Sequence, residues 1–295
     1  MNAREQGFLL LTSHLGDPQR KVLTVAQLRN LFLRVQAADA PTQDRELTCE
    51  DITALGYDRE TAMRILELLS QQEQLDWYVK RGYKAGCIPI SRISAQYPLV
   101  LRKKLGLDCP GCLWAKGDLD LLGKPAISLV GSRELLKQNA AFAKEVGRQA
   151  ARQGYVLISG NAKGADQTAQ NACLEAGGKV IAIVADALEN QPLNDCILYL
   201  SEDGFDLPFS GLRALSRNHF IHAMGKITLV AQCNFEKGGT WDGTKNNLKK
   251  GYSPVFCFRD GSKGVEALLN MGANPVSLEQ LDDFSALEPK QTSFL

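Results

Sequence analysis

From Pro125 onward, short runs of β-branched and other apolar residues alternate with amphipathic stretches, and this alternation limits the chain to few folds. The apolar runs predict strands at residues 126–130, 156–159, 180–184, 227–231 and 255–258. The amphipathic stretches predict helices at residues 134–153, 166–176, 211–224, 244–250 and 264–271. Strands that alternate with helices pair in parallel and need right-handed crossovers. The sequence therefore predicts an α/β fold in which a doubly wound, mainly parallel sheet has helices on both faces.

The N-terminal third lacks this alternation and is predicted to form a small helical domain. Residues 24–35 carry an apolar stripe at helical spacing, and a polar break follows at 37–46. Asp58 is placed to cap a further helix. We expect this helical domain at 1–95, the sheet domain at 96–285 and a flexible tail at 286–295.

Composition argues against a membrane protein and for a cytoplasmic one. With 295 residues, 44% of them hydrophobic, the chain can build one full α/β domain and a smaller companion. No apolar run approaches the roughly 20 residues that cross a bilayer. The eight cysteines are scattered singly, which favours reduced thiols over a disulfide framework.

Net charge alone does not indicate a nucleic-acid-binding protein, because the formal balance is only +1 at pH 7. A basic stretch between Trp77 and Leu107 nevertheless contains cations and interleaved aromatic residues without any Asp or Glu. Its members are Trp77, Tyr78, Lys80, Arg81, Tyr83, Lys84, Arg92, Tyr97, Arg102, Lys103 and Lys104. A positive groove with aromatic platforms is typical of proteins that bind single strands. The alternative is a solvated connector whose aromatic residues belong to the core.

Three glycine-rich turns follow the first, second and fourth predicted strands, at the edge where doubly wound sheets bind ligands. Glycine lets the backbone approach a phosphate, the first amides of the next helix favour an anion, and Arg or Lys neutralises it. The predicted phosphate- and nucleic-acid-binding residues are Gly131, Ser132, Arg133, Ser159, Gly160, Lys163, Gly164, Asp166, Arg217, Asn218, Gly238, Gly239, Thr240, Thr244 and Lys245. We expect Arg133, Lys163 and Arg217 to converge on one site for an anion.

The sequence gives no sign of a standard nucleotide enzyme or a metal centre. It contains neither a P-loop nor a dinucleotide-binding fingerprint. Cys109 and Cys112 have zinc-knuckle spacing, but no second close pair of Cys or His lies nearby, which favours an ordinary loop. His219 and His222 lie three residues apart on a predicted helix without an acidic or Cys partner in reach, so a metal is disfavoured. We expect no cofactor, no metal and no enzymatic activity.

The ordered motifs of residues 96–277 resemble those of the DprA/Smf family. The motifs are Tyr97-Pro98, residues 113–118, residues 130–133, Ser159-Gly160-x-Ala162-x-Gly164-x-Asp166, Arg217-Asn218 and Gly238-Gly239-Thr240. The resemblance implies a Rossmann-like fold that binds single-stranded DNA without strong sequence preference. It also implies a homodimer that protects incoming strands and passes them to a RecA-type recombinase.

Several departures from the family pattern place the chain away from the members dedicated to transformation. His219 stands where the family has a second Arg, which removes a cation at neutral pH. The third turn reads Gly-Gly-Thr-Trp-Asp-Gly-Thr from Gly238, in place of the family's Ser-Gly-Ser-Leu, and the sequence shows no winged-helix segment after the sheet domain. A cognate toxin in a defence module is therefore an alternative partner to the recombinase.

Two other functions compete with single-strand binding. The third turn also resembles that of the Lonely Guy phosphoribohydrolases, which suggests a sensor of a small nucleotide. Asn247 stands where those enzymes have a carboxylate, and an amide neither takes up a proton nor stabilises an oxocarbenium-like charge, so hydrolysis by that route is disfavoured. The other alternative is a protein-binding antitoxin or regulator, because a fold does not fix a function.

Overall fold

In the computed structural model of the chain, which describes residues 1–38, 45–202 and 204–288, a nine-stranded sheet runs through the molecule in the order β1-β2-β6-β5-β4-β3-β7-β8-β9. The strands are β1 (Ile88–Ser91), β2 (Cys112–Lys116), β3 (Ala126–Val130), β4 (Val156–Ser159), β5 (Val180–Ile183), β6 (Ile197–Glu202), β7 (Thr228–Val230), β8 (Val255–Phe258) and β9 (Asn274–Val276). β2 pairs antiparallel with β1 and β6, whereas every pairing from β6 to β9 is parallel. The predicted α/β class and the mainly parallel, doubly wound sheet are confirmed.

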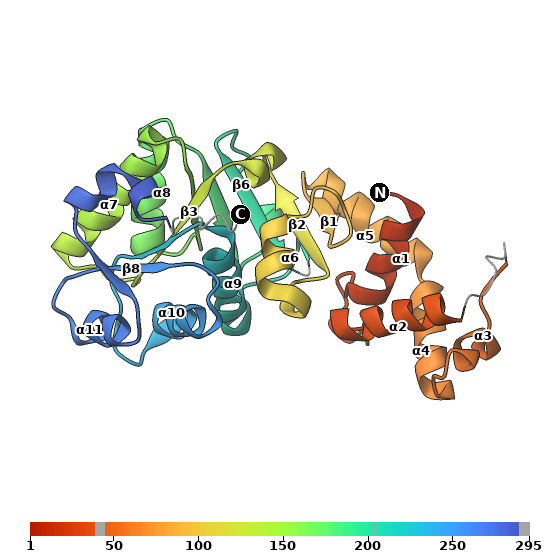
Figure 1. Ribbon diagram of the computed structural model, residues 1–295. Coiled ribbons are helices and arrows are strands. Elements are labelled where there is room, and N and C mark those ends of the chain that lie inside the picture. The colour runs from red at the N-terminus through yellow and green to blue at the C-terminus, as the bar shows by residue number, and fades with distance from the viewer. Residues whose placement is uncertain (39–44, 203, 289–295) are drawn as a thin grey trace, which may run out of the picture.

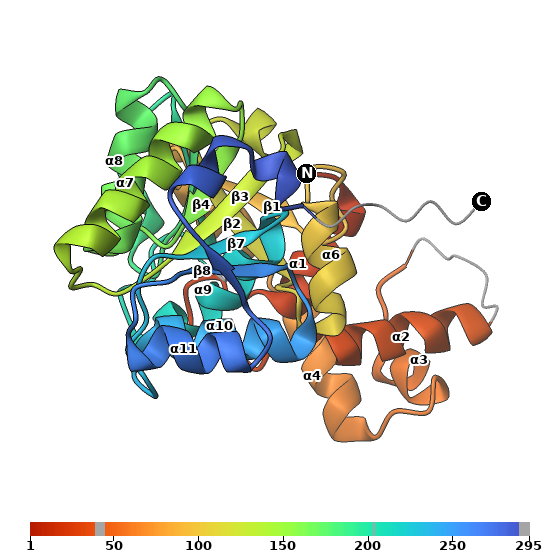
Figure 2. The ribbon, with the colours of Figure 1, turned by 60° about the vertical axis from the view of Figure 1, so that its left-hand side comes forward.

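Helices cover both faces of this sheet (Figures 1 and 2). They are α6 (Leu99–Leu105), α7 (Lys137–Arg152), α8 (Ala165–Glu175), α9 (Gly211–Met224), α10 (Gly238–Lys250) and α11 (Lys263–Asn270). On one face, Phe142 of α7 and Ala169 of α8 are buried in a common core with Leu129 of β3. On the other face, Phe220 of α9 and Trp241 of α10 are buried in a second core. The sheet is thus the middle layer of three.

The N-terminal helices project from the β1 end of the sheet (Figure 1). They are α1 (Ala3–Thr12), α2 (Val25–Ala37), α3 (Cys49–Ala54), α4 (Arg59–Leu69) and α5 (Gln72–Lys84). Apolar residues of α1 to α4 form a small core of their own, and Asp58 caps α4 by accepting a hydrogen bond from the Thr61 amide at 2.8 Å, as predicted. α5 instead packs on the sheet, where the Tyr78 ring lies 5.4 Å from that of Trp114.

Four strands were not predicted, namely β1, β2, β6 and β9. The prediction missed β6 because only a 3-10 turn at Leu188–Asn190 separates it from β5, whereas a βαβ unit has a helix there. β1 falls within residues 1–95, which the sequence assigned to the helical domain, and it lies at the edge of the sheet. The domain boundary near residue 95 stays a prediction.

The chain remains anchored after the last strand. The Glu288 carboxylate accepts hydrogen bonds from Lys226 Nζ at 2.9 Å and from the Tyr155 hydroxyl at 2.7 Å, and Leu287 packs against the core. Part of the predicted tail at 286–295 is therefore held, and residues 289–295 lie outside the described part of the chain, as do 39–44 of the predicted polar break. Within the described residues, every helix is too short or too polar to span a bilayer.

Candidate nucleic-acid interface

The turns after β3, β4 and β7 open at one edge of the sheet, because these neighbouring strands are parallel. From β3 the chain proceeds to β4 on one side, while β7 pairs with β3 on the other side, so this edge holds the topological switch point. A pocket of about 530 Å³ lies there. Its walls come from the turn after β3, the middle of α9 and the first turn of α10.

Many of the predicted site residues line this pocket. They are Gly131, Ser132, Arg133, Asp166, Arg217, Asn218, Gly238, Gly239 and Thr240. The remaining predicted residues do not line it: Ser159, Gly160, Lys163, Gly164, Thr244 and Lys245. Arg133 and Arg217 therefore meet at one pocket as expected, whereas the exposed Lys163 does not join them.

The third glycine-rich segment is a helix rather than a turn, so that part of the prediction was wrong. α10 begins at Gly238, and no side chain caps its first turn. Glycine weakens a helix signal in the sequence, but a Cβ at Gly239 would lie 2.7 Å from the Asn218 amide nitrogen, so the close packing of α10 on α9 requires glycine. Thr244 lies in the second turn of this helix and is completely buried, which removes it from any ligand surface.

Arg217 is a buried cation that supports one wall of the pocket. Its side chain is 8% exposed, and its Nη1 donates to the carbonyl oxygens of Gly160 and, at 3.2 Å, of Ile183. Burial lowers the pKa of Arg217, an effect that the nearby charge of Asp166 opposes. Among the described residues, the Arg217 Nε donor has no hydrogen-bond partner. An unpaired buried donor is costly, so an acceptor on a ligand is favoured here.

Asp166 and Gly160 pack tightly against this arginine. Burial raises the pKa of the Asp166 carboxyl to about 6, while Arg217 and the amide of Ala162, which donates to Oδ2 at 3.1 Å, oppose that shift. A Cβ at Gly160 would lie 2.9 Å from Asp166 Oδ2 and 3.0 Å from the Arg217 guanidinium. Gly160 is thus needed for packing behind the pocket, while Ser159 is buried and accepts from Gln170 Nε2 at 2.5 Å.

Residues that the sequence did not single out complete the pocket. Lys237 is exposed beside the start of α10, and Phe209 and Leu215 line the pocket with exposed fractions of 56% and 44%. The sequence offered one signal for Phe209. It is an aromatic residue that follows a proline and directly precedes a helix capped by Ser210. The pocket therefore combines exposed cations with an accessible aromatic ring.

The residues weighed as metal ligands have other partners. Cys109 is buried with its sulfur 2.8 Å from the Tyr97 hydroxyl. His222 is buried with Nδ1 3.1 Å from Asn247 Nδ2 and 3.3 Å from Thr228 Oγ1, and burial lowers its pKa to about 3, so it is neutral. Within the ranges that the structure describes, no three His, Cys, Asp or Glu side chains are grouped to hold a metal ion.

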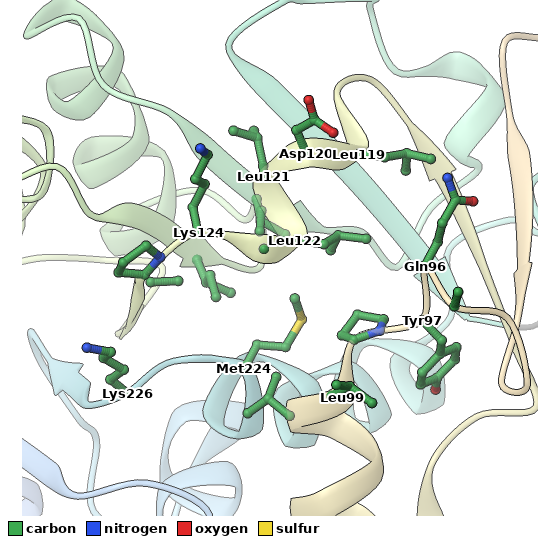
Figure 3. Close-up of a pocket in the computed structure, with 18 residues that line it drawn as sticks. Gln96, Tyr97, Leu99, Leu119, Asp120, Leu121, Leu122, Lys124, Met224 and Lys226 are labelled. Atoms are coloured by element: carbon green, nitrogen blue, oxygen red, sulfur yellow. The ribbon is translucent and has the colours of Figure 1, made fainter.

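A second cavity, of about 540 Å³, lies beside the start of β3 (Figure 3). Leu99, Leu122 and Met224 surround it, with Lys124 and Lys226 to one side. Lys226 is already paired with Glu288 at 2.9 Å. Because the two volumes are nearly equal, their chemistry decides between them. Of these two cavities in the described part of the chain, the pocket at the carboxyl edge is the one that combines a helix start, a buried arginine and exposed cations.

The fold and this pocket define a Rossmann-like protein with a cation-lined pocket at the switch point of its sheet. The chain belongs to the DNA recombination-mediator protein A family, whose model matches residues 89–287. The predicted resemblance to the DprA/Smf family is thereby confirmed.

Individual relatives agree with this assignment. The chain is 36% identical to DNA processing protein DprA of Streptococcus pneumoniae over 186 residues, which cover 59% of the chain and 66% of the relative. It is 35% identical to the DprA of Bacillus subtilis over 204 residues, covering 64% and 67%. The matches thus span about two thirds of each relative.

Solved structures show the same fold. The crystal structure of the Streptococcus pneumoniae DprA superposes with a TM-score of 0.75 and 25% identity, covering 98% of this chain and 99% of that one. The DprA of Helicobacter pylori, described for its single-stranded DNA binding mode, superposes with a TM-score of 0.57 and 21% identity, covering 69% and 97%.

Proposed function

We propose that the chain binds single-stranded DNA in the pocket at the switch point and serves in DNA processing. One observation carries this proposal: Arg133, Lys237 and the buried Arg217 line the same pocket as the uncapped first turn of α10. Helix-start amides and cations together favour phosphate. The names of the relatives, which are DNA-processing proteins, support the same ligand.

The solvent exposure of each cation indicates its role in the pocket. Arg133 and Lys237 are exposed and neutralise the strand's phosphates, while Arg217 holds the wall behind them. Phe209 offers an open ring face on which a base can stack. Phosphate contacts and stacking read no base edges, so we expect weak sequence preference.

The volume of the pocket favours one alternative, a sensor of a small nucleotide. A volume of about 530 Å³ is typical of pockets that bind small molecules. Hydrolysis of such a nucleotide is not part of the proposal. Asn247 is buried and holds the Ser253 amide at 2.9 Å, and it does not line the pocket. A recombinase, a cognate toxin and a second copy of the chain remain predicted partners.

Fluorescence anisotropy with a labelled oligothymidylate tests the proposal. Arg133→Ala and Lys237→Ala should each weaken binding, whereas Lys249→Ala, an exposed lysine at the far end of α10, should not. Unlabelled mononucleotide serves as competitor. Full displacement of the oligothymidylate by micromolar mononucleotide would favour the sensor, and no affinity for the oligothymidylate would overturn single-strand binding.

A further inference from the structure

One face of α5 carries a tryptophan and three cations in line. Trp77, Lys80, Arg81 and Lys84 are spaced by three or four residues, which places them on one side of a helix. Trp77 is 57% exposed, and both lysines are exposed. The opposite side of α5 is buried in the core through Leu75 and Tyr78. We call the exposed group the α5 face.

The aromatic residues of the basic stretch between Trp77 and Leu107 fall into two groups, one buried in the core and one exposed. Tyr78 and Tyr97 are buried and belong to the core, as the connector interpretation expected. Trp77 and Tyr83 are exposed by 57% and 50%, as an aromatic platform requires. The Arg81 guanidinium lies 5.0 Å from the centre of the Trp77 ring, a distance at which cation and ring attract each other and the ring is steadied.

The α5 face is joined to the pocket by the segment 204–210. Asp206 in this segment accepts hydrogen bonds from Arg81 at 2.8 Å and from the Tyr78 hydroxyl at 2.6 Å. Three residues later the same segment supplies Phe209 to the pocket. Arg213 of α9 holds its middle by donating to the carbonyl oxygens of Leu207 at 2.9 Å and Pro208 at 3.1 Å.

The segment that contacts α5 also begins at the edge of the sheet that holds the pocket. β6, which leads into segment 204–210, is parallel to β5, β4 and β3, so its end opens beside the pocket. Strand spacings of about 4.8 Å place β6 about 14 Å from β3 across the sheet. Because Arg81 of α5 contacts Asp206 just after β6, an extended DNA strand that crosses this distance from the pocket reaches the α5 side of segment 204–210.

We propose that the α5 face is a second contact surface for the DNA strand held in the pocket, an inference that rests on the proposed function. The strand leaves the pocket over Phe209 and continues onto Trp77, which stacks on a base, while Lys80 and Lys84 neutralise phosphates. Arg81 is already paired with Asp206 and steadies the indole. A nucleic acid fits this surface because the helix carries no acidic residue from Trp77 to its end.

Two oligonucleotides distinguish binding in the pocket from binding on the α5 face. One of about four nucleotides fills the pocket alone, and one of about sixteen also reaches α5. The double variant Lys80→Ala/Lys84→Ala should bind the long strand more weakly, with a salt slope reduced by about 1.4, or 0.7 per phosphate. It should bind the short strand as wild type does. The matched control is Lys249→Ala/Lys250→Ala, which removes the same charge from the far end of α10.

Intrinsic fluorescence reports Trp77 directly, because Trp114 and Trp241 are only 1% and 4% exposed. The long strand should quench emission and the short one should not. Trp77→Ala should weaken long-strand binding about 5- to 150-fold, and Trp77→Phe, which keeps a ring, should restore most of it.

These measurements test the α5 contact separately from the proposed function. Equal affinity of wild type and Lys80→Ala/Lys84→Ala for the long strand, or equal quenching by both strands, would overturn the α5 contact while leaving the pocket intact. If wild type binds neither strand, the proposed function itself fails.

Discussion

Arg217 of α9 donates a hydrogen bond to the carbonyl oxygen of Gly160, in the turn after β4. This contact joins two segments that lie 57 residues apart in the chain, and it fixes the wall behind the pocket at the switch point. Arg217 therefore supports the wall of the pocket, and the ligand contact that the sequence expects of it stays a prediction.

Arg217→Ala should destabilise the fold, because it removes the larger of the two cationic influences on buried Asp166 and takes a donor away from two carbonyl oxygens. Breaking such a buried arrangement costs about 3 kcal/mol. The free energy of unfolding, measured with urea, checks this value. Arg133→Ala, an exposed change, should stay within about 0.5 kcal/mol of wild type. Equal stability of the two variants would contradict the supporting role of Arg217.

Gly160→Ala should lower both stability and DNA affinity, because its Cβ would press on Asp166 Oδ2 at 2.9 Å and on the Arg217 guanidinium at 3.0 Å. Overpacking of this kind costs about 1–3 kcal/mol. Gly7→Ala in α1 is the matched control, since no described residue outside the backbone of α1 and the chain neighbours lies within 4 Å of its new Cβ. That control should gain up to about 1 kcal/mol. Thermal unfolding of the two variants in parallel decides the prediction.

DNA affinity should rise as pH falls through about 6. Burial raises the pKa of Asp166 to about 6, so below that pH the pocket loses a negative charge beside the bound phosphate. The phosphodiesters of the strand keep their charge over this range. Asp166→Asn should abolish the pH dependence. Affinity that is flat from pH 5 to pH 7.5 in wild type would show that Asp166 does not act on the ligand.

The same shift has a consequence for folding. Because the folded pKa of Asp166 lies above the unfolded value of 3.8, the folded state binds this proton more tightly. The contribution of Asp166 to stability is therefore fully present below pH 3.8 and is lost as pH rises through about 6. Urea titrations of wild type and Asp166→Asn at pH 5 and pH 7 measure this difference.

Asn247→Asp should not create a nucleotide hydrolase. Asn247 Nδ2 donates to Ser253 Oγ at 3.2 Å and lies 3.1 Å from His222 Nδ1 in the core, so a carboxylate there faces the protein and not the pocket. Loss of these donor contacts should cost about 1–3 kcal/mol. Release of base from nucleoside monophosphates, followed by chromatography, should stay at background. Turnover in the variant would show that the pocket reaches this residue.

Local signals in the sequence were sufficient for the central strands and for the turn that presents Arg133. Short apolar, β-branched runs in the sequence predicted β3, β4 and β8 with the bounds that the structure shows. Asp58 caps α4, as the rule for residues that precede a helix predicts. Local rules could not predict the start of α10. Glycines weaken an isolated helix, but here the close packing of α10 on α9 requires them. Lys163 does not line the pocket, which the sequence could not show because strand order places a turn at an edge without fixing where its side chains lie.

The burial of Arg217 also lay outside what sequence patterns contain. Nothing distinguishes an arginine on the exposed side of a helix from one that reaches two distant carbonyl groups until the strands are assembled. Phe209 and Lys237 were overlooked for a related reason, since their importance comes from the neighbours that the fold brings to them.

A salt titration of single-strand binding tests the central claim most directly. Wild type, Arg133→Ala and Lys237→Ala are compared with Lys249→Ala, using one long oligothymidylate and ionic strengths from 50 to 300 mM. If the pocket neutralises phosphates, Arg133→Ala and Lys237→Ala should each weaken binding and reduce the slope of log K against log salt by about 0.7, whereas Lys249→Ala should match wild type. Unchanged affinity and slope in both pocket variants would contradict single-strand binding at this site.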